Sequence, residues 1–92
     1  MKVARKRPGK PWEFAEIDNT LEALQAEVGG YIETLTVCSD ACLIMNEEGR
    51  LLDLPFNFRW GTYRFYGTVL LVGVEGEEFG DVPLTKLNFL PE

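Results

Sequence analysis

The stretch 17–33 constrains the fold of this chain more than any other. Asn19 can cap a helix because its side chain can accept a hydrogen bond from a free N–H group of the first turn, and Glu22 can complete a capping box. The apolar side chains that follow recur at helical intervals and form one narrow face: Leu21, Leu24 and Val28. The pattern predicts a short helix at about 19–28.

A helix of about ten residues is too short to be stable alone in water, so this one must pack against other elements. The glycine pair Gly29-Gly30 can end it through a left-handed conformation. The chain then enters Tyr31–Val37, which is rich in β-branched and aromatic residues and predicts a strand. This order predicts a helix that packs on a sheet.

Other strand-forming runs predict that the sheet is antiparallel. Met1–Arg7 and Trp12–Ile17 flank a turn that contains Pro8 and Gly9, so they predict a hairpin. Further runs of strand-forming residues predict three more strands: Ala41–Met45, Thr62–Tyr66 and Val69–Val74.

The remaining segments complete the prediction. Asn46–Arg50 indicates a turn in which we expect a positive φ at Gly49. Glu75–Val82 indicates an acidic loop, and Leu84–Leu90 indicates a short C-terminal helix. The predicted fold class is therefore α+β, with a single domain over residues 1–92 that consists mainly of an antiparallel sheet packed by one short helix.

Charge is distributed unevenly along the chain. Five of the nine basic side chains lie within residues 1–10, which predicts a basic N-terminal strand or arm. The other 82 residues carry four basic and all fifteen acidic side chains. So acidic a body disfavours direct binding to nucleic acid. The basic start could be an arm that contacts phosphate, or the acidic body could mimic DNA and occupy a DNA-binding protein. The alternative is a solvated acidic surface with a basic edge strand.

Neither a membrane segment nor an export signal is predicted. The longest apolar run, Val69–Val72, is far shorter than the roughly 20 residues of a membrane helix. The basic N-terminus is not followed by the apolar region of a secretory signal, so we expect a cytoplasmic protein without membrane contact.

Catalytic side chains are scarce. The chain contains no histidine, and Ser39 is its only serine, which excludes imidazole-based triads and histidine-ligated metals. We expect no enzyme activity, no cofactor and no metal. Cys38 and Cys42 are spaced unlike a zinc knuckle, and they could pair across the intervening turn. Reduced thiols are expected in the cytoplasm.

One group of side chains resembles a binding surface. Rings, guanidinium groups and an amide occur within ten residues: Asn57, Arg59, Trp60, Tyr63, Arg64 and Tyr66. Aromatic and arginine side chains stack on nucleobases and bind phosphates. They are also enriched at protein–protein hot spots. The alternative is that the rings belong to the core and the arginines extend into solvent.

Several blocks of sequence resemble a known family. They occur in the order Asn19–Gln25, Val28–Glu33, Asn46–Gly49, Leu54–Asn57 and Gly67–Gly73. They are similar to a family of small domains of unknown function carried by bacteriophages and bacterial mobile elements, often beside antirestriction genes. The resemblance covers most of residues 13–85 and implies a compact α+β fold and a phage-like setting, but no activity.

In that setting we expect a protein that acts stoichiometrically on host defence. We predict a homo-oligomer in the cytoplasm of the host bacterium that sequesters a nucleotide-derived immune signal. The expected contacts come from Asn57, Arg59, Trp60, Tyr31 and Thr68. The alternative is an acidic inhibitor or DNA mimic that acts on a host defence or DNA-binding protein. A metal-dependent enzyme built on paired carboxylates is a third, weaker option.

Overall fold

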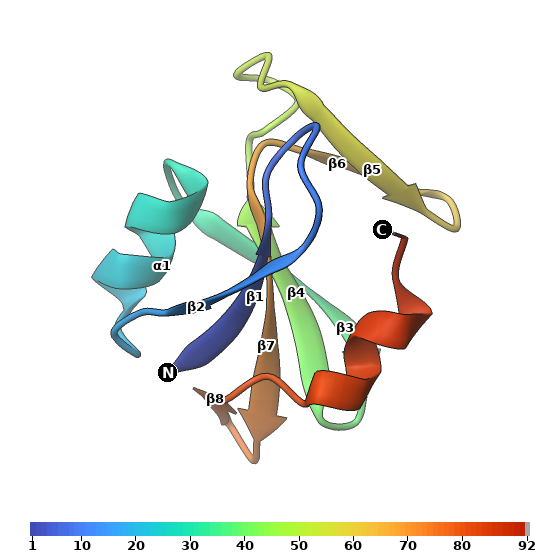
Figure 1. The fold of residues 1–92 in the computed structure, drawn as a ribbon. Helices are drawn as coiled ribbons and strands as arrows, with labels where there is room; N and C mark the ends of the chain where they lie inside the picture. The colour runs from blue at the N-terminus through green and yellow to red at the C-terminus, as the bar shows by residue number, and fades with distance from the viewer. Residues whose placement is uncertain (92) are drawn as a thin grey trace.

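An antiparallel sheet of six strands forms the centre of the molecule in the computed structural model, which describes residues 1–91 (Figure 1). The strand order is β2-β1-β7-β4-β3, and β8 pairs with the end of β7. A separate two-stranded hairpin consists of β5 and β6. The elements are β1 (Lys2–Lys6), β2 (Glu13–Glu16), α1 (Leu21–Val28), β3 (Ile32–Cys38), β4 (Ala41–Asn46), β5 (Phe56–Trp60), β6 (Tyr63–Tyr66), β7 (Val69–Glu75), β8 (Glu78–Gly80) and the 3-10 helix η1 (Leu84–Phe89).

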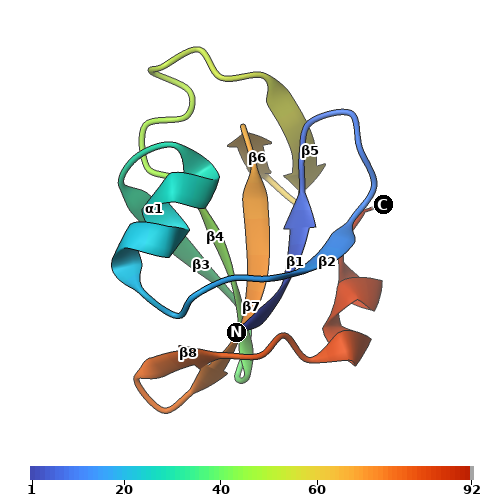
Figure 2. The same ribbon diagram turned by 60° about the vertical axis from the view of Figure 1, so that its left-hand side comes forward.

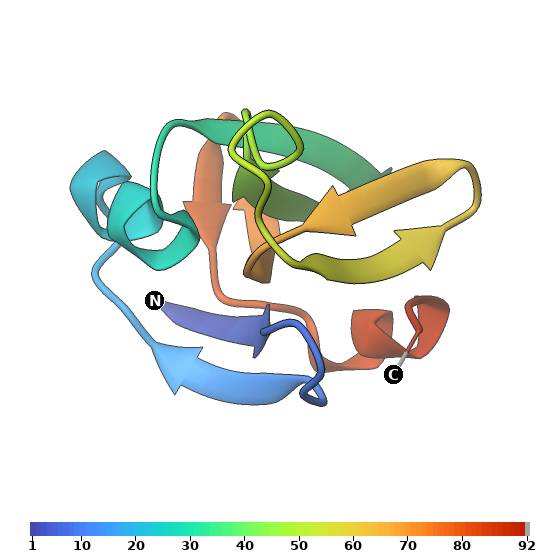
Figure 3. The ribbon, with the colours of Figure 1, turned by 90° about the horizontal axis from the view of Figure 1, so that it is seen from above.

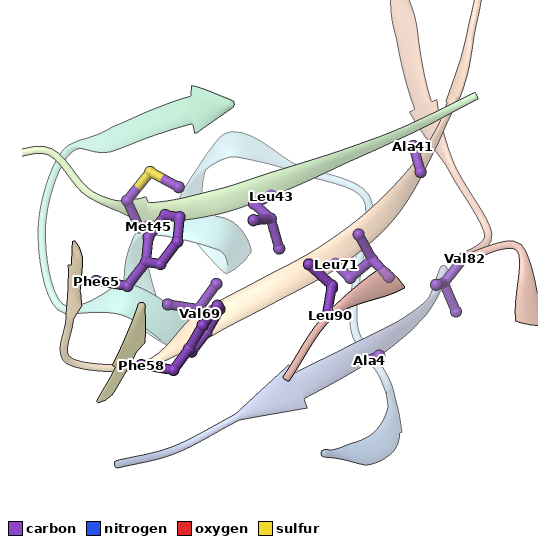
Figure 4. Close-up of a cluster of buried hydrophobic side chains, with 10 residues drawn as sticks. All are labelled: Ala4, Ala41, Leu43, Met45, Phe58, Phe65, Val69, Leu71, Val82 and Leu90. Carbon is purple, nitrogen blue, oxygen red and sulfur yellow. The ribbon is translucent and has the colours of Figure 1, made fainter. Parts of the chain in front are cut away.

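The two faces of the sheet are covered by different elements. Figure 3 shows α1 on one side and the β5–β6 hairpin on the other. Alternate residues of the central strands supply two apolar clusters because successive side chains point to opposite faces. Leu43 and Leu71 pack with the hairpin (Figure 4), whereas Ile44 and Leu70 pack with α1. The predicted helix-on-sheet arrangement is confirmed.

The helix begins one residue later than the capping prediction. Thr20 Oγ1, rather than Asn19, accepts a hydrogen bond from Ala23 N at 3.1 Å. Asn19 Nδ2 instead donates to Phe79 O at 2.9 Å, which ties the approach to the helix to β8. Gly29, with φ 80°, ends the helix as predicted. No helix within residues 1–91 is long and apolar enough to cross a membrane.

Three local predictions are corrected. The expected acidic loop 75–82 contains β8, and the expected C-terminal helix is only the 3-10 helix η1. Gly49 does not take a positive φ; Asp53 does, at 59°. Gly49 is needed for space, because a Cβ at that position would lie 2.9 Å from Tyr66 O.

Three of the five basic residues of the N-terminus belong to the sheet. Strand β1, which runs between β2 and β7, contains Lys2, Arg5 and Lys6. Arg5 makes salt bridges to Glu27 at 2.6 Å and Glu13 at 3.3 Å, and Arg7 contacts Glu13 at 3.0 Å. Desolvation opposes the charge of Arg5, but the hydrogen bonds and charges of these carboxylates outweigh it and raise the pKa of the guanidinium. Arg5 and Arg7 are therefore already paired with carboxylates of α1 and β2.

The two cysteines are free and belong to different sides of the sheet. Cys38 follows a bulge in β3 and packs against the hairpin side, whereas Cys42 is buried on the helix side. A disulfide between them would require the strands to rearrange. Burial raises the pKa of the Cys42 thiol to about 11.

We expect iodoacetamide at pH 8 to label Cys38 in the folded protein and Cys42 only after unfolding, as judged by mass spectrometry of peptides. Folded Cys42 keeps its proton at a pH at which the unfolded chain has released it. The free energy of unfolding should therefore fall as the pH rises from 9.0 to about 11. Equal labelling rates for both thiols would contradict this burial.

Candidate functional site

The β5–β6 hairpin separates rings from arginines. Gly61 occupies the first position of its two-residue turn with φ 61°, as a type II′ turn requires. Phe58 pairs with Phe65, and both rings are buried with centroids 4.7 Å apart. Arg59 pairs with Arg64 and therefore lies on the opposite, outer face. The outer face of the hairpin thus carries two guanidinium groups side by side.

A groove of about 340 Å³ lies between this hairpin, β3 and the turn that follows β4. We call it the hairpin groove. It receives acidic and apolar side chains from β3, a turn from the end of β4, and polar and aromatic side chains from β6. Its lining residues are Glu33, Leu35, Met45, Asn46, Glu47, Gly49, Arg50, Thr62, Tyr63, Arg64, Phe65 and Tyr66.

Three arginines in and beside the groove have no carboxylate partner among residues 1–91. Arg50 and Arg64 line the groove, and Arg59 stands opposite Arg64 on the neighbouring strand. None of them forms a salt bridge within the described part of the chain, in contrast to Arg5 and Arg7. Like charges directly opposite each other weaken a strand pair. An anion bound between these groups would remove that repulsion.

The other polar groups define what the groove can recognise. Tyr63 is 52% exposed. Tyr66 is half-buried, and its ring packs edge-on against that of Phe56 with centroids 5.7 Å apart. Glu33 and Glu47 place carboxylates on the wall contributed by β3 and the turn. The groove therefore combines anion-binding guanidinium groups, flat rings and hydrogen-bond acceptors. Among residues 1–91, no group of three or more His, Cys, Asp or Glu could hold a metal ion.

A buried asparagine shapes the turn that forms one wall of the groove. Asn46 is only 5% exposed; its Nδ2 donates to Val28 O at 3.1 Å and its Oδ1 accepts from Glu48 N at 2.7 Å. A Cβ on Gly30 would lie 2.9 Å from Asn46 Nδ2, so the absence of a side chain at Gly30 leaves room for the Asn46 amide and its two hydrogen bonds. The end of α1 and the turn after β4 are thereby held together.

Residues 1–89 match the family described as Domain of unknown function (DUF3846). The chain belongs to this family. The match covers the whole sheet, the hairpin and α1, so the DUF3846 domain and the fold described above coincide. No curated protein and no solved structure matches the chain.

The structure distributes the five predicted contact residues of this DUF3846 domain over several places. Arg59 adjoins the groove through Arg64. Trp60 packs against the hairpin-side core. Tyr31, 68% exposed, lies at a second pocket beside α1, and Thr68 lies in the link between β6 and β7. The structure therefore does not gather them into one pocket.

The fifth residue, Asn57, is occupied by the backbone. Its Nδ2 donates to Lys6 O and to Gly67 O, each at 2.8 Å, and so fastens β5 to the end of β1 and to the start of the β6–β7 link. Its Oδ1 is buried without a partner in the described chain. This contact explains an asparagine at the position by folding alone.

Sequence reasoning missed Arg50 and placed Arg64 in the cluster without selecting it. Arg50 lies five residues beyond Met45, where the predicted strand ends, and it belongs to a turn. An arginine in a turn is ordinarily solvated. Figure 2 shows why the turn matters, since the connection from β4 to β5 passes over the end of α1 before it enters the hairpin. Only that path brings Arg50 to the same groove as Arg64.

Proposed function

We propose that this DUF3846 domain binds a nucleotide-derived small molecule in the hairpin groove and sequesters it without turnover. The observation that carries the proposal is the set of unpaired arginines Arg50, Arg59 and Arg64. The chain has fifteen acidic side chains, yet none forms a salt bridge with these three among residues 1–91. Guanidinium groups that form no salt bridge within the described chain are suited to bind an external anion.

The chemistry of the groove matches the parts of a nucleotide. Arginine binds phosphate oxygens through two parallel hydrogen bonds. The rings of Tyr63 and Tyr66 offer surfaces on which a base can stack. Glu33 and Glu47 can accept hydrogen bonds from ribose hydroxyls or an exocyclic amino group. A volume of about 340 Å³ is at the small end of ligand pockets, which favours one nucleotide unit per groove.

Sequestration is favoured over turnover by the side chains available. The chain lacks histidine, and Ser39 precedes β4 at the end of that strand opposite to the groove. The resemblance to phage-borne domains supports a nucleotide immune signal of the host bacterium as the ligand, captured in the cytoplasm by a homo-oligomer. Neither a cofactor nor a catalytic residue is part of this proposal.

Native mass spectrometry of the purified protein tests the proposal, before and after addition of mononucleotides, cyclic nucleotides, ADP-ribose and inorganic phosphate. We expect a saturable adduct of nucleotide mass, and we expect the ligand to be chemically unchanged when it is released by denaturation. A protein that binds none of these compounds would refute the proposed ligand class. Conversion of the ligand would refute sequestration.

The exposed carboxylates at the β7–β8 turn favour a second candidate, an acidic inhibitor or DNA mimic that binds a host protein. They are Glu75, Glu77 and Glu78, and the exposed Asp81 follows β8. This candidate predicts salt-sensitive binding to a basic protein and no small-molecule adduct. Charge reversal at Glu77 and Glu78 would then abolish binding, whereas changes to Arg64 would not.

A further inference from the structure

We propose that two copies of this chain pair in antiparallel fashion along the free edge of β3, with Thr34 at the twofold axis. The pairing would place the two hairpin grooves beside each other at the interface. The dimer is inferred from β3 alone, whereas its effect on ligand binding rests on the proposed function.

Hydrogen-bond alternation shows which backbone groups of β3 are free. Glu47 N donates to Tyr31 O at 2.9 Å, so this pair of residues is hydrogen-bonded between the strands. In an antiparallel ladder such pairs alternate with pairs whose N–H and C=O groups point away. The register of β3 with β4 therefore turns the backbone groups of Ile32, Thr34 and Thr36 outward. No other strand within residues 1–91 pairs with that side of β3.

The two edges of the sheet differ in how they are protected against pairing. At one edge, β2 has four residues and presents Glu13 and Glu16, and Pro11 lies just before it. Such short, charged strands discourage edge-to-edge contact. At the other edge, β3 has seven residues without proline or lysine and contains four β-branched side chains. It lies along the upper border of the molecule in Figure 3. The regular segment of β3 is longer than β2 and carries a single charge, Glu33, so this edge is less protected than that of β2.

The sequence of β3 selects one register for a second copy. The strand is regular from Ile32 to Thr36, and a bulge follows between Thr36 and Cys38. Centring the pair on Thr34 uses every outward-facing residue of the regular segment, since Ile32 then bonds to the partner's Thr36. Glu33 lies opposite the partner's Leu35, so no like charges meet. Centring on Glu33 would oppose two carboxylates, which is destabilising.

The same register joins the two candidate sites. Glu33 and Leu35 line the hairpin groove and belong to the edge strand. In the dimer Glu33 would lie opposite the partner's Leu35, and Leu35 opposite the partner's Glu33, so the wall of one groove would continue into the other. A ligand with two phosphate-bearing units could then span both grooves, which a single 340 Å³ groove would not enclose.

Sedimentation velocity without ligand, over about 1–100 μM, tests the dimer. We expect a reversible monomer–dimer equilibrium for the unmodified chain. Thr34→Lys adds the residue type that protects natural edges and opposes two cations at the axis, so it should weaken dimerisation at least about tenfold. Phe14→Lys is the matched control, because Phe14 is 55% exposed on β2 and receives the same charge at the other edge. It should leave the equilibrium unchanged.

Hydrogen exchange distinguishes this interface from any other. The amides of Ile32, Thr34 and Thr36 should be protected in the dimer and exchange rapidly in Thr34→Lys, while those of Glu33 and Leu35 stay protected by β4 in both. A chain that is monomeric throughout, or a dimer that Thr34→Lys leaves intact, would overturn the proposal. A ligand-free dimer that binds no nucleotide would instead refute the proposed function and leave the interface standing.

Discussion

Changing Arg64 to glutamine is expected to weaken nucleotide binding about 10- to 100-fold, the range that follows from losing hydrogen bonds to a charged group. Arg64 lines the hairpin groove, has no carboxylate partner among residues 1–91 and stands opposite Arg59. Glutamine keeps a polar side chain but removes the charge and the forked donor geometry. Isothermal titration with the nucleotide that native mass spectrometry selects measures the change.

Arg7→Gln is the control for this substitution. Arg7 is also exposed, but it contacts Glu13 at 3.0 Å beyond β1 and does not line the groove. Its loss should leave binding within about twofold of the unmodified protein, since an exposed ion pair contributes little. Arg64→Gln should also melt no lower than the unmodified protein, because it relieves a repulsive cross-strand pair. Unchanged affinity in Arg64→Gln would exclude the groove as the binding site.

The elements that could be predicted from the sequence are those in which apolar residues recur without interruption at helical intervals or in a continuous strand-forming run. The apolar face of α1 and its glycine stop are local signals, and the seven residues of β7 form a strand at the predicted place. The segment that forms β5, Phe56–Trp60, has no regular alternation of buried and exposed residues. A register shift between Phe56 and Phe58 explains this, because a bulge at Asn57 moves the following side chains to the other face. A three-residue strand such as β8 is too short to show any period.

The candidate site was harder to predict than the fold because it is assembled from three distant segments. Glu33, Arg50 and Arg64 meet only through the pairing of β3 with β4 and the packing of the hairpin over the sheet. Asn57 shows a second difficulty. It belongs to a cluster of polar and aromatic residues that predicts a ligand contact, and the amide nitrogen of Asn57 also donates to two backbone carbonyls. Residue type alone does not separate these uses.

Gly73→Ala is expected to destabilise the protein by about 2–4 kcal/mol, more than an ordinary surface change. Gly73 lies in β7 between Ala41 of β4 and Gly80 of β8, and it has no positive φ. A Cβ there would overlap the carbonyl oxygen of Asp81 and lie 3.2 Å from Gly80 O. These are backbone atoms, so β8 must move away. Thermal unfolding followed by circular dichroism should show a fall of roughly 10–20 °C.

The loss should spread beyond β8, because the segment after it also holds β1. Asp81 Oδ1 accepts a hydrogen bond from Lys2 N at 2.8 Å, and Val82 N donates to Lys2 O at 2.9 Å. Gly9→Ala provides the comparison: Gly9 has φ 75° but open space around a Cβ, so its cost is only the roughly 1–2 kcal/mol of a left-handed residue. A melting temperature of Gly73→Ala equal to or above that of Gly9→Ala would contradict the close contact between β7 and the backbone that follows Gly80. A melting temperature well below that of Gly9→Ala would show that this close contact requires glycine at position 73.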